Sequence, residues 1–97
     1  MTLEIPGVQN PVMDYARKTG WLAWRMQIKG RNGCPDAFFF KGGQLMMIEF
    51  KRPGKSPTPQ QLKRHKELRA AGLEVYVVDD PEVGKRLLDE LSSRCTP

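Results

Sequence analysis

The sequence predicts an α/β protein with a four-stranded mixed sheet flanked by helices, and three observations lead to that fold class. Four segments rich in aromatic and β-branched residues alternate with three segments of helical spacing, in the order helix–strand–strand–strand–helix–strand–helix. Gly42-Gly43 is a hairpin turn signal between the second and third strands. A helix then connects the third strand to the fourth, a crossover that should be right-handed if those strands are parallel. The 97 residues are expected to form one domain, 1–97.

The N-terminal part predicts an arm, a helix and a strand. Residues 1–9 are expected to form a short N-terminal arm. Asn10 and Pro11 suit the N-cap and the first helical position, and Gly20 would end that helix. The aromatic and apolar segment 21–27 then reads as the first strand, followed by a basic loop that contains glycine.

The central part predicts a hairpin. Residues 37–40 form the second expected strand and residues 44–51 the third, with the glycine pair between them. The third strand is apolar over most of its length, which is typical of a strand covered on both faces.

The C-terminal part predicts a helix, a strand and a second helix. Thr58, Pro59 and Gln61 supply a cap, a first-turn proline and the glutamine of a capping box, and the helix should run to about Ala71. A fourth strand is expected over residues 73–80. The chain then predicts an amphipathic helix over residues 81–93.

Composition and charge narrow the class of protein. No apolar run approaches the ~20 residues of a membrane span, and the N-terminus lacks the basic and apolar regions of a secretory signal. Two cysteines do not make a disulfide framework, so a reducing cytoplasmic setting is expected. The formal net charge is +5, and residues 51–69 carry seven Lys and Arg against Glu67 alone. A basic surface of this kind favours a polyanion partner, although a solvated helix face would have the same composition.

Three charged residues in and beside the most apolar segments are the candidates for chemistry. Side chains alternate along a strand, so Glu49 and Lys51 point to one face. The register set by the glycine turn pairs residue 36 with residues 49–50, which places Asp36 beside Glu49. Two adjacent carboxylates repel each other unless a proton or a cation lies between them. A hard divalent ion, Mg²⁺ or Mn²⁺, is therefore expected there.

A lone Glu-x-Lys pattern is common, and by itself it would indicate a surface ion pair with Asp36 as a turn residue. The combination is more specific. "GCPD" precedes a short hairpin, "IEFK" ends it, and "QQLKRHKELRAAGLEVYVVD" follows in register. This set resembles the virus-type replication-repair nuclease (VRR-NUC) family of the PD-(D/E)xK nuclease superfamily, from about Trp21 to Leu91. The resemblance implies a restriction-endonuclease-like α-β-β-β-α-β core and a metal-dependent nuclease.

The resemblance also implies a role for each matching position. Asp36 and Glu49 resemble the family's two metal-binding carboxylates, and the main-chain carbonyl of Phe50 would complete the metal shell. Lys51 resembles the lysine that positions the attacking water and stabilises developing negative charge. Gln61 resembles the helix glutamine near the site, but as a capping-box residue it could instead bond only to its own helix. The sequence is compatible with both interpretations of Gln61.

The sequence departs from the family in its first helix, where members usually carry a glutamate that supports the metal. The nearest candidates are Glu4, Gln9 and Asp14, and Gln9 lies closest to the expected position but has no charge. Either Glu4 fills the role as a further metal ligand, or the site has one fewer carboxylate.

Several other residues have both a functional and a structural interpretation. His65 is expected to be a partly exposed helix residue, and Cys34 a small packing residue. Trp21 and Trp24 suit base stacking or, more commonly, core or interface packing. The candidates for contacts with DNA phosphates are Arg25, Lys29, Arg31, Arg52, Lys55, Lys63 and Arg64.

The leading hypothesis is a Mg²⁺- or Mn²⁺-dependent endonuclease that cuts branched DNA such as Holliday junctions. A homodimer in the cytoplasm of a bacterium or a phage-infected cell would suit such a substrate, and neither a membrane nor a small molecule is an expected partner. The alternative is a catalytically weak or inactive DNA-binding module of the same fold. A protein-interaction domain with a coincidental Glu-x-Lys is the third hypothesis.

Overall fold

The computed structural model describes residues 4–26 and 33–94. Its elements are α1 (Ile5–Lys18), β1 (Leu22–Arg25), β2 (Ala37–Lys41), β3 (Gln44–Phe50), α2 (Pro59–Ala70), β4 (Glu74–Val78) and α3 (Pro81–Ser92). The predicted fold class and element order are confirmed. The strands are shorter than predicted by one or more residues at their ends, except that β2 extends one residue further, to Lys41.

The four strands form one mixed sheet in the order β1-β2-β3-β4. β1, β2 and β3 pair antiparallel, and β4 lies parallel to β3. The β2–β3 hairpin closes at Lys41 and Gln44, with Gly42 and Gly43 at φ values of +56° and +80°. Two consecutive residues in this left-handed region favour glycine, and they give the turn that matches the twist of a hairpin. The turn therefore fixes the register that pairs Ala37 with Ile48.

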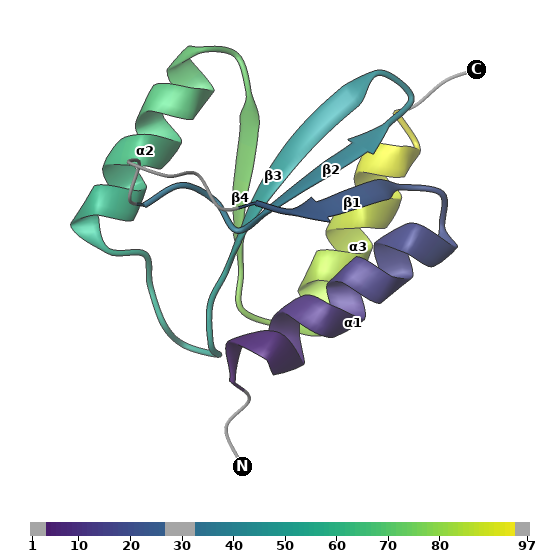
Figure 1. Cartoon of the computed structure of the whole chain (residues 1–97), viewed down its shortest axis with the longest axis horizontal. Coiled ribbons are helices and arrows are strands. Elements are labelled where there is room, and N and C mark those ends of the chain that lie inside the picture. The colour runs from purple at the N-terminus through teal and green to yellow at the C-terminus, as the bar shows by residue number, and fades with distance from the viewer. Residues whose placement is uncertain (1–3, 27–32, 95–97) are drawn as a thin grey trace.

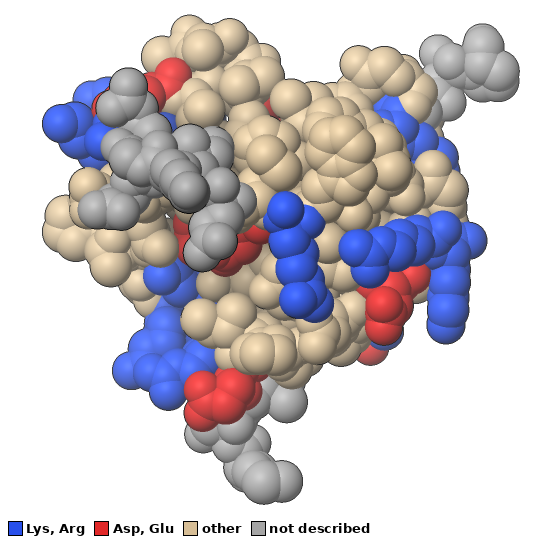
Figure 2. Space-filling view, viewed as in Figure 1, with Lys and Arg blue, Asp and Glu red and all other residues tan. Residues whose placement is uncertain are grey.

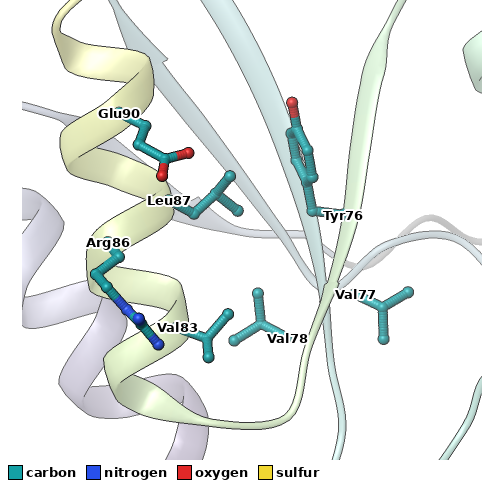
Figure 3. Close-up of a pocket in the computed structure, with 7 residues that line it drawn as sticks. All are labelled: Tyr76, Val77, Val78, Val83, Arg86, Leu87 and Glu90. Atoms are coloured by element: carbon teal, nitrogen blue, oxygen red, sulfur yellow. The ribbon is translucent and has the colours of Figure 1, made fainter.

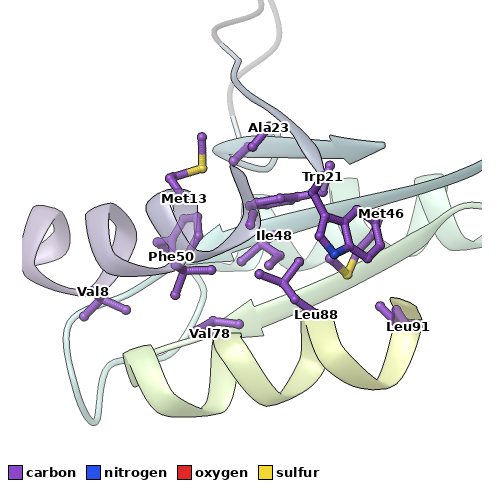
Figure 4. Packing of buried hydrophobic residues seen from close by; sticks show 14 residues of the cluster. Val8, Met13, Trp21, Ala23, Met46, Ile48, Phe50, Val78, Leu88 and Leu91 are labelled. Carbon is purple, nitrogen blue, oxygen red and sulfur yellow. The ribbon is translucent and has the colours of Figure 1, made fainter. Parts of the chain in front are cut away.

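The helices lie on opposite faces of the sheet, with α1 and α3 side by side on one face and α2 on the other side, beside β4 (Figure 1). The main core lies under α1 and α3, where Met46, Ile48 and Phe50 of β3 meet apolar residues of both helices (Figure 4). Because side chains alternate along a strand, Met47 and Glu49 point away from this core. Both are nevertheless buried, so β3 is covered on both faces, as its composition predicts.

The first helix begins earlier than predicted, because it starts at Ile5 and not after Asn10. Residues 5–9 are therefore helical, and the predicted arm over residues 1–9 is wrong for that part. Pro6 occupies the first turn, and Pro11 lies inside the helix. A proline in a helix interior costs about 3 kcal/mol, and burial of the α1 face that packs on the core offsets this cost.

The two tryptophans have different environments. Trp21 is 3% exposed and belongs to the core, whereas Trp24 is 51% exposed and packs edge-on against Phe40, with ring centroids 5.1 Å apart. Core packing thus holds for Trp21 and fails for Trp24. Cys34 is partly buried and forms no disulfide, in line with a packing role. No helix in the described ranges is long and apolar enough to cross a membrane.

Candidate metal and catalytic site

Asp36 is held against the end of β3, next to Glu49. Its main-chain N–H donates to the Ile48 carbonyl over 3.1 Å, and its side-chain Oδ2 accepts from the Phe50 N–H over 2.8 Å. The regular β2–β3 pairing ends at Ala37 and Ile48, and these two bonds hold Asp36 against β3 just beyond that end. The hairpin thus brings Asp36 and Glu49 together at one end of the sheet, in the arrangement the turn position predicts.

Glu49 is an almost fully buried carboxyl, with 2% of its surface exposed. Burial, the negative charge of Asp36 and a hydrogen bond with that residue together raise the pKa of Glu49 from 4.5 to about 8, with burial the largest cause. The positive charge of Lys51 opposes the rise in pKa. At neutral pH the metal-free Glu49 therefore keeps a proton, because two carboxylates in one low-dielectric site cannot both ionise without a cation.

Gln61 makes both of the contacts left open by the sequence, one within its own helix and one to Glu49. Its N–H donates to Thr58 Oγ1 over 3.2 Å while its Oε1 accepts from the Thr58 N–H over 2.9 Å, which completes a capping box at the start of α2. At the same time its Nε2 donates to Glu49 Oε2 over 3.1 Å. The side-chain oxygen accepts a hydrogen bond at the start of α2 while the side-chain nitrogen donates to Glu49, so one conformation of Gln61 makes both contacts.

His65 is fully buried, and the prediction of partial exposure is wrong. Its Nε2 lies 3.6 Å from Glu49 Oε1, and burial, followed by the charges of Arg69 and Lys51, lowers the pKa of the imidazole. The sequence carried a signal for this position, since His65 lies four residues after Gln61 and therefore on the same helix face.

Lys51 follows β3 and is anchored there by its main-chain N–H, which donates to the Val78 carbonyl over 2.9 Å. Its ammonium group lowers the pKa values of both Glu49 and His65, so its charge acts within the site. The structure therefore places the carboxyl groups of Asp36 and Glu49 and the ammonium group of Lys51 on the face of β3 opposite the main core.

The N-terminal helix presents Gln9, and not a carboxylate, to the site. Gln9 lines a cleft of about 410 Å³ together with Arg25, Met26 and Asp36. Glu4 lies instead at the N-cap of α1, 3.9 Å from Arg52. Within residues 4–26 and 33–94, no cluster of three or more His, Cys, Asp or Glu side chains is arranged to hold a metal ion. Two carboxylates are thus the acidic ligands that these ranges supply.

These two carboxylates fit a hard divalent cation. Glu49 Oε1 is buried and has no hydrogen-bond partner among the described protein groups, and Asp36 lies beside it. Carboxylate and carbonyl oxygens are the ligands that Mg²⁺ and Mn²⁺ prefer. A bound cation would let both carboxyl groups ionise and would replace the proton that Glu49 otherwise keeps.

The candidate phosphate contacts differ in how they are engaged. Arg25 donates to Asn10 Oδ1, Arg52 lies near Glu4, and Arg64 donates to Glu67 over 3.0 and 3.2 Å. Lys55 and Lys63 are exposed, whereas Lys29 and Arg31 lie outside the described residues. On the face of the molecule drawn in Figure 2, Lys and Arg form several separate groups, with acidic side chains near some of them. The basic surface is therefore divided.

A separate groove lies between β4 and α3 (Figure 3). Tyr76, Val83 and Leu87 are among the residues that line it, and none of the predicted catalytic residues does. The groove is therefore distinct from the candidate site.

Comparison with known proteins agrees with the fold. No family model matches the chain. The chain is 33% identical over 81 residues to "Putative nuclease p44" of Acyrthosiphon pisum secondary endosymbiont phage 1, which covers 82% of this chain and 87% of that protein. A solved structure described as a VRR_NUC domain superposes with a TM-score of 0.80 at 27% identity, over 90% of this chain and 97% of the other.

Proposed function

Because this chain belongs to the VRR-NUC family of nucleases, we propose that it is a metal-dependent endonuclease that hydrolyses DNA phosphodiester bonds at branched structures such as Holliday junctions. The observation that carries this proposal is the buried Glu49 beside Asp36, with the charge of Lys51 acting on the same site. A carboxyl pair without a cation between its members is costly, and a divalent ion removes that cost.

Each residue of the site has a distinct task in this proposal. Asp36, Glu49 and the main-chain carbonyl of Phe50 hold Mg²⁺ or Mn²⁺. A bound divalent ion supplies Lewis acidity toward the phosphate and lowers the pKa of water. Lys51 provides positive charge where negative charge grows in the transition state. Gln61 orients the Glu49 carboxylate through its 3.1 Å hydrogen bond.

The contacts that the protein can make with DNA favour selection of the substrate by the shape of the DNA. The candidate contacts around the site are lysines and arginines, which bind phosphates and carry no base-sequence information directly. We therefore assign selectivity to the geometry of the DNA. The phage origin of the 33% identical relative supports action on DNA inside a phage-infected bacterial cell.

A homodimer would present two such sites to a near-symmetric junction. Leu22 and Trp24 support this part of the proposal, because they are 52% and 51% exposed and lie two residues apart on the same face of β1. Light scattering coupled to size-exclusion chromatography measures the oligomeric state, and a monomeric wild type at micromolar concentration would reject the dimer.

The central test is cleavage of a synthetic four-way junction, a flap, a linear duplex and a single strand in Mg²⁺ or Mn²⁺. The variants are Asp36→Ala and Lys51→Ala. Their matched controls are Asp14→Ala and Lys18→Ala, which remove the same charges from exposed positions of α1. We expect the wild type and both controls to cut the branched substrates, and both site variants to lose cleavage by at least about 100-fold.

The outcomes separate the competing functions. Salt-sensitive DNA binding without cleavage, unchanged in the site variants, would favour the inactive DNA-binding module. The uncharged Gln9 in the cleft is the observation that keeps this second candidate in view. Absence of DNA binding would reject both.

A further inference from the structure

His65 is an unusual residue to bury in α2. It is 0% exposed and is the one fully buried residue of this helix, whereas Leu62, three residues earlier, is 53% exposed. A helix that is held to its sheet by apolar packing alone would bury the leucine and expose the histidine. The reversal indicates that the imidazole is held inside for its polar atoms.

Those atoms face the candidate metal site. His65 Nε2 lies 3.6 Å from Glu49 Oε1, while Gln61 Nε2 lies 3.1 Å from Glu49 Oε2. Residues four apart in a helix lie one turn apart on the same face. Two residues on one face of α2 therefore each lie near a different oxygen of the Glu49 carboxylate.

The contact between His65 and Glu49 is longer than a hydrogen bond, unlike the contact between Gln61 and Glu49. Among the described protein groups, Glu49 Oε1 and both ring nitrogens of His65 lack a hydrogen-bond partner. A neutral imidazole carries one N–H, and a carboxylate has about four lone-pair positions to receive donors. A shift of a few tenths of an ångström would turn the 3.6 Å contact into a hydrogen bond.

We propose that His65 is a positioning residue of the metal site, whose Nε2–H donates to Glu49 Oε1 and, with Gln61, fixes the plane of the Glu49 carboxylate. This inference rests on the proposed function, because it assumes that Glu49 is a metal ligand. Two lone-pair positions of the carboxylate are occupied by α2, and the other two stay available for the cation beside Asp36. In this arrangement His65 acts through Glu49 and is not itself a ligand.

The expected loss of metal affinity is that caused by removing a residue that is hydrogen-bonded to a metal ligand. Loss of such a partner typically weakens metal binding by about 10- to 100-fold. The cause is loss of orientation, because the carboxylate can then rotate away from the geometry that the cation requires. The fold should survive if the replacement keeps the buried volume.

The first test measures Mn²⁺ affinity by isothermal titration calorimetry on the DNA-free protein, with the melting temperature recorded for each variant. His65→Leu removes the hydrogen-bond donor and fills the buried position with an apolar side chain. We expect Mn²⁺ affinity to fall by about 10- to 100-fold. His65→Gln keeps an N–H donor and should recover part of that loss. Leu68→Ala is the matched control, since it removes a partly buried side chain of the same helix, and it should lower the melting temperature without changing Mn²⁺ affinity.

The second test uses the unmutated protein, so it stands even if His65→Leu fails to fold. Long-range ¹H–¹⁵N NMR identifies which ring nitrogen of His65 carries the proton in saturating Mg²⁺. We expect the Nε2–H form, and an Nδ1–H form would overturn the proposal.

The remaining outcomes keep this inference separate from the proposed function. If the wild type binds Mn²⁺ and cuts DNA but His65→Leu binds Mn²⁺ equally well, the positioning role is wrong and the nuclease assignment stands. If His65→Gln binds as weakly as His65→Leu, the donor role is likewise refuted. If the wild type neither binds a divalent ion nor cuts DNA, both proposals fall.

Discussion

The buried carboxyl of Glu49 makes the stability of the metal-free protein depend on pH. Its pKa is 4.5 when exposed and about 8 in the folded protein. Because the pKa is raised, the folded state binds the proton more tightly than the unfolded state does. The stabilisation from this proton is complete below the unfolded pKa and is lost as the pH rises through about 8.

The size of the effect can be worked out for the range between about pH 6.5 and about pH 8.5. There the unfolded Glu49 is ionised, and burial lowers the pKa of the folded His65 imidazole from 6.5. The unfolded imidazole is about half protonated at pH 6.5, and its loss of that proton offsets at most about 0.4 kcal/mol of the change. Each unit of pH over which only the unfolded form is ionised costs at most about 1.4 kcal/mol. With a folded pKa of about 8, the free energy of unfolding falls by about 2 kcal/mol across this range, or about 10 °C in melting temperature.

Urea unfolding of the metal-free protein at a series of pH values measures this change. Glu49→Gln cannot ionise, so its stability should be nearly flat over the same range, while Glu90→Gln, at an exposed position, should follow the wild type. Excess Mn²⁺ should reverse the trend, since a metal binds the ionised carboxylates. Equal pH profiles for the wild type and Glu49→Gln would refute the buried, protonated carboxyl.

Three further substitutions test other parts of the structure. Asp36→Asn removes the neighbouring negative charge, so the pKa of Glu49 should fall below about 8, as measured by ¹³C NMR titration of the carboxyl carbon. Thr58→Ala removes the α2 cap and should cost about 1 kcal/mol in urea unfolding while Mn²⁺ affinity stays unchanged. Gly84→Ala would place a Cβ 2.6 Å from Val12 Cγ2, and the overpacking should cost about 1–3 kcal/mol, which thermal unfolding would reveal.

The sequence was sufficient to predict the hairpin and the meeting of Asp36 with Glu49. Both depend on local rules, because a two-glycine turn sets the register and the register decides which residues lie opposite. Once Lys41 pairs with Gln44, each earlier residue of β2 has a defined partner in β3. The site follows from the turn without any knowledge of the distant packing.

The start of α1 could not be predicted by the same rules. Asn10-Pro11 is a good local signal for a helix start, yet the helix continues through it to Ile5. Val8 is fully buried in the main core, and its burial requires the extra turn. Here tertiary packing outweighs the local preference of proline, and sequence patterns do not report how deep a core is.

The environment of His65 was missed for a related reason. Helix α2 has almost no apolar face, so hydrophobic periodicity does not indicate which side turns inward. The inward side is instead selected by polar contacts, those of Gln61 and His65 with Glu49. A search for polar residues four apart, taken relative to the capping box, would have identified it.

The double engagement of Gln61 restricts which amino acid can occupy that position. At the third residue of a helix, glutamate completes a capping box as well as glutamine does, since a carboxylate oxygen also accepts the N-cap N–H. Glutamate has no N–H to offer Glu49, however, and it would bring a third negative charge to a place that already holds two acidic groups. The amide is the side chain of this length that accepts from one neighbour and donates to another, so the start of α2 and the charge state of the sheet beneath it constrain position 61 jointly.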